Sequence, residues 1–151
     1  MVRRRHNAKG RSGEGGKFVQ LHRWFLDTEA WRDLDPVARC AYIELSRRYG
    51  GPGSNNGRIS FSIREMAERL NVSKATAARA FERLQDHGFL AQTRKGAFSV
   101  KVRVATEWRL TEFADDVTGD LATKDFTRWK KQNTVSPEVP NGPCSETVRS
   151  T

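Results

Sequence analysis

The chain has 151 residues, and 36% of them are hydrophobic, which is enough for one core of ordinary domain size and too little for two. Its 27 Lys and Arg outnumber its 18 Asp and Glu, so the formal net charge is +9, and such a charge favours a polyanionic partner such as nucleic acid. No apolar run approaches the length of a membrane span, and the basic start lacks the apolar stretch of a secretory signal. With only Cys40 and Cys144, a disulfide framework is not expected and a reducing cytoplasm fits.

Residues 1–17 predict a disordered basic arm. They hold six Lys and Arg against one Asp or Glu, together with four glycines. The run GEGGK within them is not a phosphate-binding loop, because Arg11 stands where that motif needs glycine and Phe18 where it needs Ser or Thr. The arm contributes three weaker candidate DNA contacts, Arg3, Arg4 and Arg5.

Residues 18–36 are rich in large apolar side chains. We expect five of them to cover one end of the core: Phe18, Leu21, Trp24, Phe25 and Trp31. Asp35 then predicts a helix N-cap, with Pro36 at the first helical position, where a missing N–H costs nothing. The helix should continue to about Tyr49, bury Val37, Ala41 and Leu45, and end at Gly50-Gly51.

A second helix is predicted after the loop GGPGSNNG and a short strand over 58–61. Ser62 and Glu65 form a capping box, in which each side chain accepts from a backbone N–H, and Phe61 and Met66 take the hydrophobic-staple positions. The buried stripe repeats at helical spacing and comprises Ile63, Met66, Ala67 and Leu70.

A third helix follows after a tight turn at Asn71-Val72. Asparagine adopts the left-handed conformation that such a turn requires, and Ser73 caps the next helix. The buried stripe of this helix is predicted to be Ala77, Ala80, Phe81 and Leu84. Small residues in both helices allow the close approach that a steep crossing needs, and the outer face is left basic.

The outer face of this third helix predicts contacts with nucleic acid. Cationic side chains can reach phosphates and base edges, a capping serine can hold a phosphate at the helix N-terminus, and alanines allow close approach and contact with a thymine methyl. The candidate residues are Ser73, Lys74, Ala75, Thr76, Ala78, Arg79 and Arg83. Glu82 opposes such contacts and is placed at their edge.

A basic β ribbon is predicted after Gly88, which should end the third helix. The apolar residues at 98, 100, 102 and 104 alternate with polar ones, as in a half-buried strand. Residues 89–94 can pair with 98–104 through a tight turn at Lys95-Gly96, or with 107–111 across a longer loop. The candidate contacts of the ribbon are Arg94, Lys95, Lys101 and Arg103, whereas Trp108 and Leu110 should pack on the core.

Residues 114–131 predict a short docking segment, in which Phe126 and Trp129 lie one helical turn apart. Residues 132–151 contain three prolines and little to bury, so a disordered tail is expected. The predicted organisation is therefore an arm (1–17), one domain (18–113), a docking segment (114–131) and a tail (132–151).

The region from about Phe18 to Phe113, above all GSNNGRISFSIREMAERLNVSKATAARAFERLQDHGFL, resembles the winged helix-turn-helix proteins of bacterial plasmids, phages and other mobile elements. The resemblance implies an α+β, mainly α fold in which the third helix enters the major groove of DNA and the ribbon forms a wing. It also implies a bacterial, nucleoid-associated location and a candidate homodimer. Asn71 stands where such proteins often have glycine.

Three functions follow from this reading. The leading one is a sequence-specific double-stranded DNA-binding protein, a transcriptional regulator of a mobile element or plasmid. The second is a plasmid or phage replication initiator or an accessory origin-binding protein, with a protein partner recruited through the segment around Trp129. The third is a winged helix that binds protein and has lost DNA binding.

No enzyme, metal site, cofactor or small-molecule ligand is predicted. His6, His22 and His87 lie far apart without ligand-like spacing, and no nucleophile and base or paired acids emerge. His87 beside Gly88 is interpreted as a charge or cap partner at a helix C-terminus.

Overall fold

The computed structural model describes residues 17–98 and 103–131. The fold is α+β and mainly helical. The helices are α1 (Arg23–Leu26), α2 (Glu29–Asp33), α3 (Pro36–Arg48), α4 (Ile63–Leu70) and α5 (Lys74–Asp86), with a short 3₁₀ helix η1 (Asp125–Thr127). The strands are β1 (Ile59–Ser60), β2 (Leu90–Arg94), β3 (Ala97–Phe98), β4 (Arg103–Val104) and β5 (Glu107–Leu110). The predicted tail and the arm up to residue 16 lie outside the described residues.

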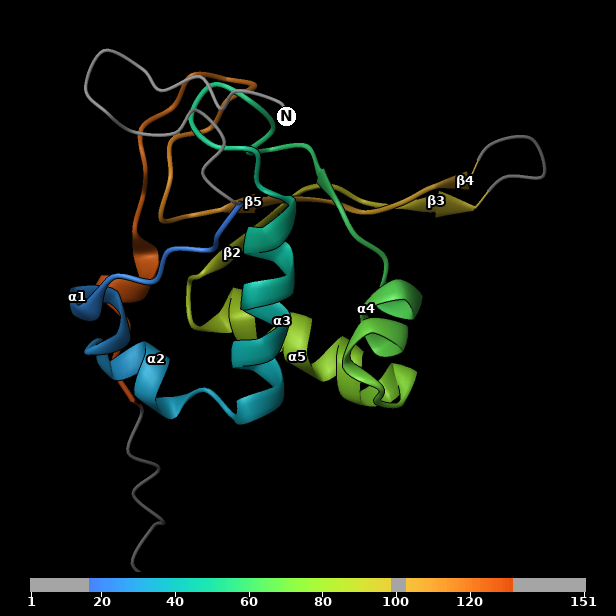
Figure 1. Ribbon diagram of the computed structural model, residues 1–151, viewed down its shortest axis with the longest axis horizontal. Helices are drawn as coiled ribbons and strands as arrows, with labels where there is room; N and C mark the ends of the chain where they lie inside the picture. The colour runs from blue at the N-terminus through green and yellow to red at the C-terminus, as the bar shows by residue number, and fades with distance from the viewer. Residues whose placement is uncertain (1–16, 99–102, 132–151) are drawn as a thin grey trace, which may run out of the picture.

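Helices α3, α4 and α5 and the three-stranded sheet form the centre of the molecule, and α1 and α2 add Phe25, Ala30 and Trp31 to its core (Figure 1). Helices α3, α4 and α5 pack on one another, and β2 packs on α5. The paired strands β3 and β4 extend beyond this body on the side where α4 lies. Within the described ranges, no helix combines the length and the apolar character needed to cross a bilayer.

The helix starts follow the predicted capping chemistry. Asp35 Oδ1 accepts from the Ala38 N–H (2.8 Å), and Ser62 Oγ accepts from the Glu65 N–H (3.2 Å). The reciprocal half of the capping box is wrong, because the carboxylate of Glu65 accepts from the guanidinium of Arg48 on α3. A long-range ion pair thus replaces a local bond and joins α3 to the start of α4.

The predicted buried stripes hold for most of their members. The four residues of the α5 stripe are at most 2% exposed, and Ala41 and Leu45 of α3 are fully buried. Val37 is only partly buried, because Ala38 and Tyr42 take the inner side of α3. Ile63 is 44% exposed. It occupies the first position of α4, where the buried ring of Phe61 already fills the core.

The sheet has the strand order β1-β5-β2, and all its pairs are antiparallel. Of the two pairings that the sequence left open, the structure has β2 paired with β5 across the longer loop, with Leu90 opposite Leu110. Strands β3 and β4 pair separately, Phe98 opposite Arg103, and lengthen the same ribbon outward. Trp108 is buried as predicted, and its Nε1–H donates to the Phe61 carbonyl (2.9 Å).

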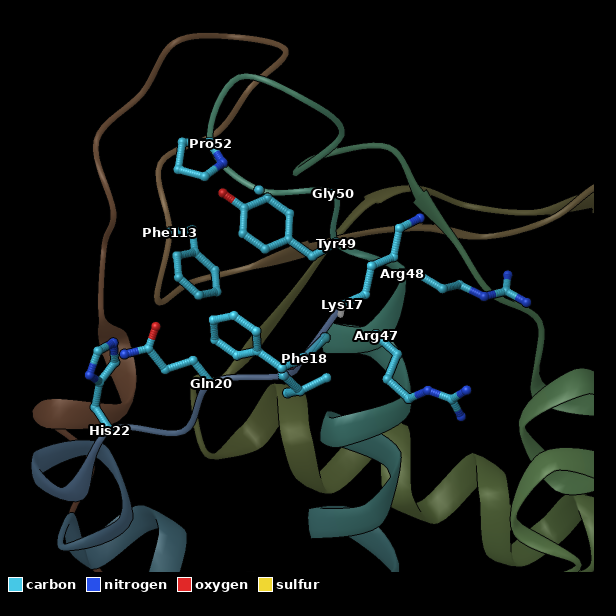
Figure 2. Close-up of a pocket in the computed structure, with 13 residues that line it drawn as sticks. Lys17, Phe18, Gln20, His22, Arg47, Arg48, Tyr49, Gly50, Pro52 and Phe113 are labelled. Atoms are coloured by element: carbon cyan, nitrogen blue, oxygen red, sulfur yellow. The ribbon is translucent and has the colours of Figure 1, made fainter. Parts of the chain in front are cut away.

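A cleft of about 900 Å³ lies at the C-terminal end of α3 (Figure 2). Residues 17–20 and His22 form one side of it, and Tyr49 and Phe113 form part of the other. Phe18 was predicted to cover the core, but its side chain is 81% exposed and lines this cleft. Trp24 is also 45% exposed, whereas Phe25 and Trp31 are buried as predicted. Phe18 is exposed because residues 17–20 form no helix or strand that packs on the core.

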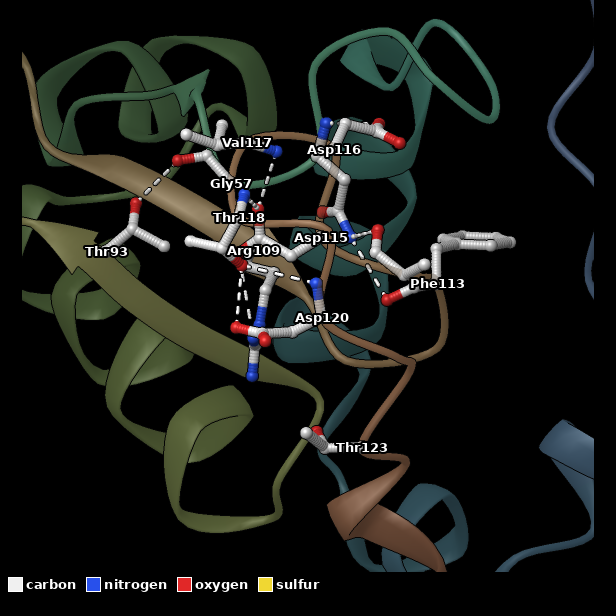
Figure 3. Close-up of polar contacts among 12 residues, drawn as sticks. Gly57, Thr93, Arg109, Phe113, Asp115, Asp116, Val117, Thr118, Asp120 and Thr123 are labelled. Carbon is white, nitrogen blue, oxygen red and sulfur yellow. Dashed lines mark hydrogen bonds and ion pairs between the residues drawn. The ribbon is translucent and has the colours of Figure 1, made fainter.

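A polar clamp fixes the loop before β1 to the chain after β5 (Figure 3). The fully buried Asn56 accepts from the Leu110 N–H (2.8 Å) and donates back to the Leu110 carbonyl (2.9 Å). Asp116 accepts from the Asn56 N–H (2.8 Å), and Arg109 pairs with Asp115 (3.6 Å). The amide of Asn56 and the carboxylate of Asp116 are hydrogen-bonded and hold the long loop to the chain after β5. The buried Nε of Arg109 has no hydrogen-bond partner among the described residues.

The segment 114–131 packs into the domain rather than standing apart from it. Phe126 is 1% exposed, and its ring lies 5.1 Å from that of Phe25 and 4.8 Å from that of Phe89. Gly88, with a φ of +75°, permits this approach, since a Cβ there would lie 2.8 Å from the backbone of Asp125 and Phe126. The folded unit therefore continues beyond residue 113, the predicted boundary, to the end of the described chain at 131.

Candidate nucleic-acid interface

The turn between α4 and α5 sets the angle of the candidate interface. Asn71 ends α4 in the left-handed conformation, with φ 53° and ψ 47°, and the Val72 N–H donates to the Ala67 carbonyl (3.0 Å). This bond and those from the Asn71 N–H satisfy the carbonyls of Ala67 and Glu68, which the end of the helix would leave without partners. The chain is extended at Ser73, whose Oγ accepts from the Thr76 N–H (3.1 Å) and starts α5. The predicted turn and cap are confirmed.

The core fixes which side of α5 faces outward. Ala77 and Ala80 are buried in the helix cluster, and the ring of Phe81 stacks on that of Trp108 with centroids 4.7 Å apart. The opposite side must then face solvent. The structure exposes Ser73, Lys74, Ala75 and Arg79 and leaves Thr76 and Ala78 partly buried.

The first two turns of α5 carry positive charge alone. Lys74 and Arg79 are exposed, and no carboxylate lies on the helix before Glu82. Within the part of the chain that the structure describes, no hydrogen bond or ion pair engages the guanidinium of Arg79. The helix dipole adds partial positive charge at the same end, so this surface attracts anions.

Arg83 lies apart from this surface. Its Nε is 3.6 Å from Oδ2 of Asp35, and its Nη1 donates weakly to the Asp33 carbonyl (3.4 Å). The sequence grouped Arg83 with Arg79 as a DNA contact, but the structure directs its side chain to the junction of α2 and α3. Its partner Asp35 lies 48 residues earlier in the sequence, so no local pattern predicts this pair.

His87 closes the C-terminal end of α5. One ring nitrogen, Nδ1, lies 2.8 Å from the Arg83 carbonyl, and the other, Nε2, lies 3.0 Å from Oδ2 of Asp33. The Trp129 ring stacks on the imidazole with centroids 4.3 Å apart. The hydrogen bond from His87, followed by that from Lys131, lowers the pKa of Asp33 to about 2. The role predicted for His87 as a cap partner is confirmed, and the chain itself covers this end of the helix.

The ribbon supplies the second part of the candidate interface. Lys95 is exposed between β2 and β3, and the exposed side chain of Arg94 lies 4.0 Å from a carboxylate oxygen of Glu107. Arg103 lies in β4, and its backbone pairs with Phe98. Lys101 and the arm arginines Arg3, Arg4 and Arg5 lie outside the described residues.

Arg69 is a further exposed cation, in the last turn of α4, two residues before Asn71. Its side chain lines a small hollow together with Glu44, Arg47 and Arg48 of α3, so the structure does not bring it together with Lys74 and Arg79. Arg64, in the first turn of α4, pairs with Glu68 on the same helix (3.0 Å).

Among the described residues, no three His, Cys, Asp or Glu side chains are placed to bind a metal ion. The chain as a whole matches no protein-family model, no curated protein and no solved structure.

Proposed function

We propose that the chain is a winged helix-turn-helix protein that binds double-stranded DNA in a sequence-specific way. In this proposal α4 and α5 form the helix-turn-helix, α5 enters the major groove, and the ribbon from β2 to β5 is the wing. One observation carries the proposal: the first two turns of α5 present exposed Lys74 and Arg79 around the small Ala75, on a helix whose other side is locked into the core.

Each group of side chains has a distinct part in this proposal. Arg79 donates to base edges, where one good bidentate contact discriminates by about 1–3 kcal/mol. Lys74 and the capping Ser73 hold a phosphate at the helix N-terminus. Ala75 lets the backbone approach the bases, and Lys95 of the wing contacts the phosphate backbone.

We further propose that the protein regulates transcription on a bacterial mobile element or plasmid. The resemblance of residues 18–113 covers small regulators and replication initiators alike, so the support for regulation is the packing of Trp129 on His87 within the body of the molecule. Recruitment of a replication partner, the alternative reading, would use only the part of Trp129 that this stacked contact leaves exposed. A dimer on two half-sites remains part of the proposal.

The test is selection of bound fragments from the DNA of the host, followed by gel shifts on the best fragment at several salt concentrations. We expect binding that exceeds binding to random competitor and that weakens as salt rises. Fragments next to promoters support regulation, and fragments within an origin support initiation. If no duplex binds better than the competitor at moderate salt, the proposal fails.

A further inference from the structure

The cleft at the end of α3 has the dimensions of a binding site. Its volume of about 900 Å³ lies within the range of roughly 300–1,000 Å³ that small-molecule sites occupy. Its walls come from the segment before α1, from the end of α3 with the following loop, and from Phe113 after β5. It shares no residue with α5 or the ribbon, so a ligand here need not compete with DNA.

Aromatic rings face each other across this cleft. Tyr49 and Phe113 stack with centroids 4.6 Å apart and an interplanar angle of 29°. Figure 2 shows Phe18 across the opening from this pair, and the side chain of Phe18 is 81% exposed. A flat ring that enters the cleft would have Phe18 on one side and the stacked pair on the other, and aromatic rings favour such neighbours.

Cations line the cleft. Among the described residues its lining includes Lys17, Arg47 and Arg48 and no carboxylate side chain, while Glu44 and Asp116 lie just beyond the lining, beside Arg47 and Tyr49. Arg48 is committed to Glu65 and to the Ser60 carbonyl. Arg47 is 55% exposed, and within the described ranges its one ion pair is with Glu44, three residues before it on the same helix. Such exposed pairs contribute little, so Arg47 can turn toward an anion.

We infer that this cleft binds a nucleotide unit, with the base stacked between Phe18 and the Tyr49–Phe113 pair and the phosphate held by Lys17 and Arg47. Stacked aromatic rings next to cations are how proteins hold unpaired nucleotides without reading their sequence. A free mononucleotide and an unpaired nucleotide of a strand share this chemistry. The inference is independent of duplex binding through α5.

The experiment is isothermal titration of the full chain with adenosine 5′-monophosphate, adenosine, ribose 5-phosphate and a short single-stranded oligoadenylate. We expect the monophosphate to bind more tightly than either of its parts. Phe18→Ala should weaken binding fivefold or more, an estimate based on about 1–3 kcal/mol per stacked base. Arg47→Gln should weaken binding of the monophosphate but not of adenosine.

Matched controls separate this cleft from the candidate DNA surface. Leu121→Ala, at a side chain 85% exposed and outside the cleft lining, and Arg79→Gln on α5 should both leave monophosphate binding unchanged. Binding of the oligoadenylate alone, if lost in Phe18→Ala, supports the inference with a strand as the source of the nucleotide.

Four results would overturn the inference. They are equal binding of ribose 5-phosphate and the monophosphate, no binding of monophosphate or oligoadenylate at millimolar concentration, oligoadenylate binding that depends on Arg79 and not on Phe18, and unchanged binding in Phe18→Ala.

Discussion

Arg83 on α5 lies with its Nε 3.6 Å from the carboxylate of Asp35, the residue that caps α3. Both side chains of this pair are partly exposed (46% and 42%), so the pair itself contributes little, but it places the Arg83 guanidinium beside the junction of α2 and α3. Since His87 and Asp33 close the same end of α5, the part of the helix left for a nucleic acid is its N-terminal half. The two arginines of α5 therefore have different expected roles.

Arg79→Ala is expected to cost about 1–3 kcal/mol of binding free energy on the best selected duplex, because it removes a contact to a base edge. Arg83→Ala should cost less than about 1 kcal/mol, since its guanidinium already has partners within the chain. Gel shifts on the selected duplex and on a scrambled duplex compare the two variants. Equal losses of specificity would mean that Arg83 leaves Asp35 when DNA binds.

Lys95→Ala should weaken binding to all duplexes by a similar factor, because a wing lysine contacts phosphates and not bases. The slope of log affinity against log salt should become shallower by about one unit. Binding isotherms of a selected and a random duplex at four salt concentrations measure both effects. A change in the ratio of the two affinities would assign Lys95 to base recognition.

Asn71→Ala should destabilise the fold by about 1–2 kcal/mol, because alanine in the left-handed conformation at φ 53° strains its Cβ against the following carbonyl. Asn71→Gly should cost little, because glycine adopts this conformation freely. Urea unfolding of both variants measures the difference. Comparable losses in the two would show that the side chain of Asn71, and not its backbone angle, holds the turn.

Phe126→Ala should destabilise the fold by about 3–5 kcal/mol, the usual cost of removing a buried aromatic ring. Leu121→Ala, in the same segment but 85% exposed, should change stability by less than about 0.5 kcal/mol. Thermal and urea unfolding distinguish the two variants. A small effect of Phe126→Ala on stability would indicate that the folded domain ends near residue 113, as the sequence predicted.

Stability should fall as pH drops from about 4 to about 2, because the pKa of Asp33 is lowered to about 2 in the folded chain from its usual value of 3.8. The carboxylate of a depressed acid stabilises the fold above its unfolded pKa, and this contribution is lost as pH falls through the folded pKa. Asp33→Asn should reduce the dependence over that window. The lowered pKa values of Glu29 and Asp116 leave a residual slope in the variant. Urea unfolding at several pH values is the measurement, and identical curves for both proteins would contradict the assignment.

Local chemistry was readable from the sequence. The caps at Asp35, Ser62 and Ser73 and the left-handed turn at Asn71 depend on residues within one helical turn of each other, so their letters were sufficient. The buried stripe of α5 followed from helical periodicity for the same reason, and it correctly oriented Lys74 and Arg79.

Contacts between distant segments were not readable. The alternation of apolar and polar residues allowed two partner segments for residues 89–94, and the pairing of β2 with β5 is one of them. Neither the attachment of Arg83 to Asp35 nor the insertion of Phe126 beside Phe25 has a local signature, since each depends on how the chain folds back. The exposure of Phe18 follows the same logic, because hydrophobicity predicts a tendency to bury and not the neighbour that buries it.

The contact of Phe126 with Phe25 and Phe89 also constrains how the protein is made. Phe25 and Phe89 contact each other, but translation delivers Phe25 about a hundred residues before Phe126, so the face of the two rings that Phe126 covers stays exposed to water until residue 126 has left the ribosome. Stalled or shortened translation products that lack Phe126 would expose this hydrophobic aromatic surface and become targets for chaperones and proteases.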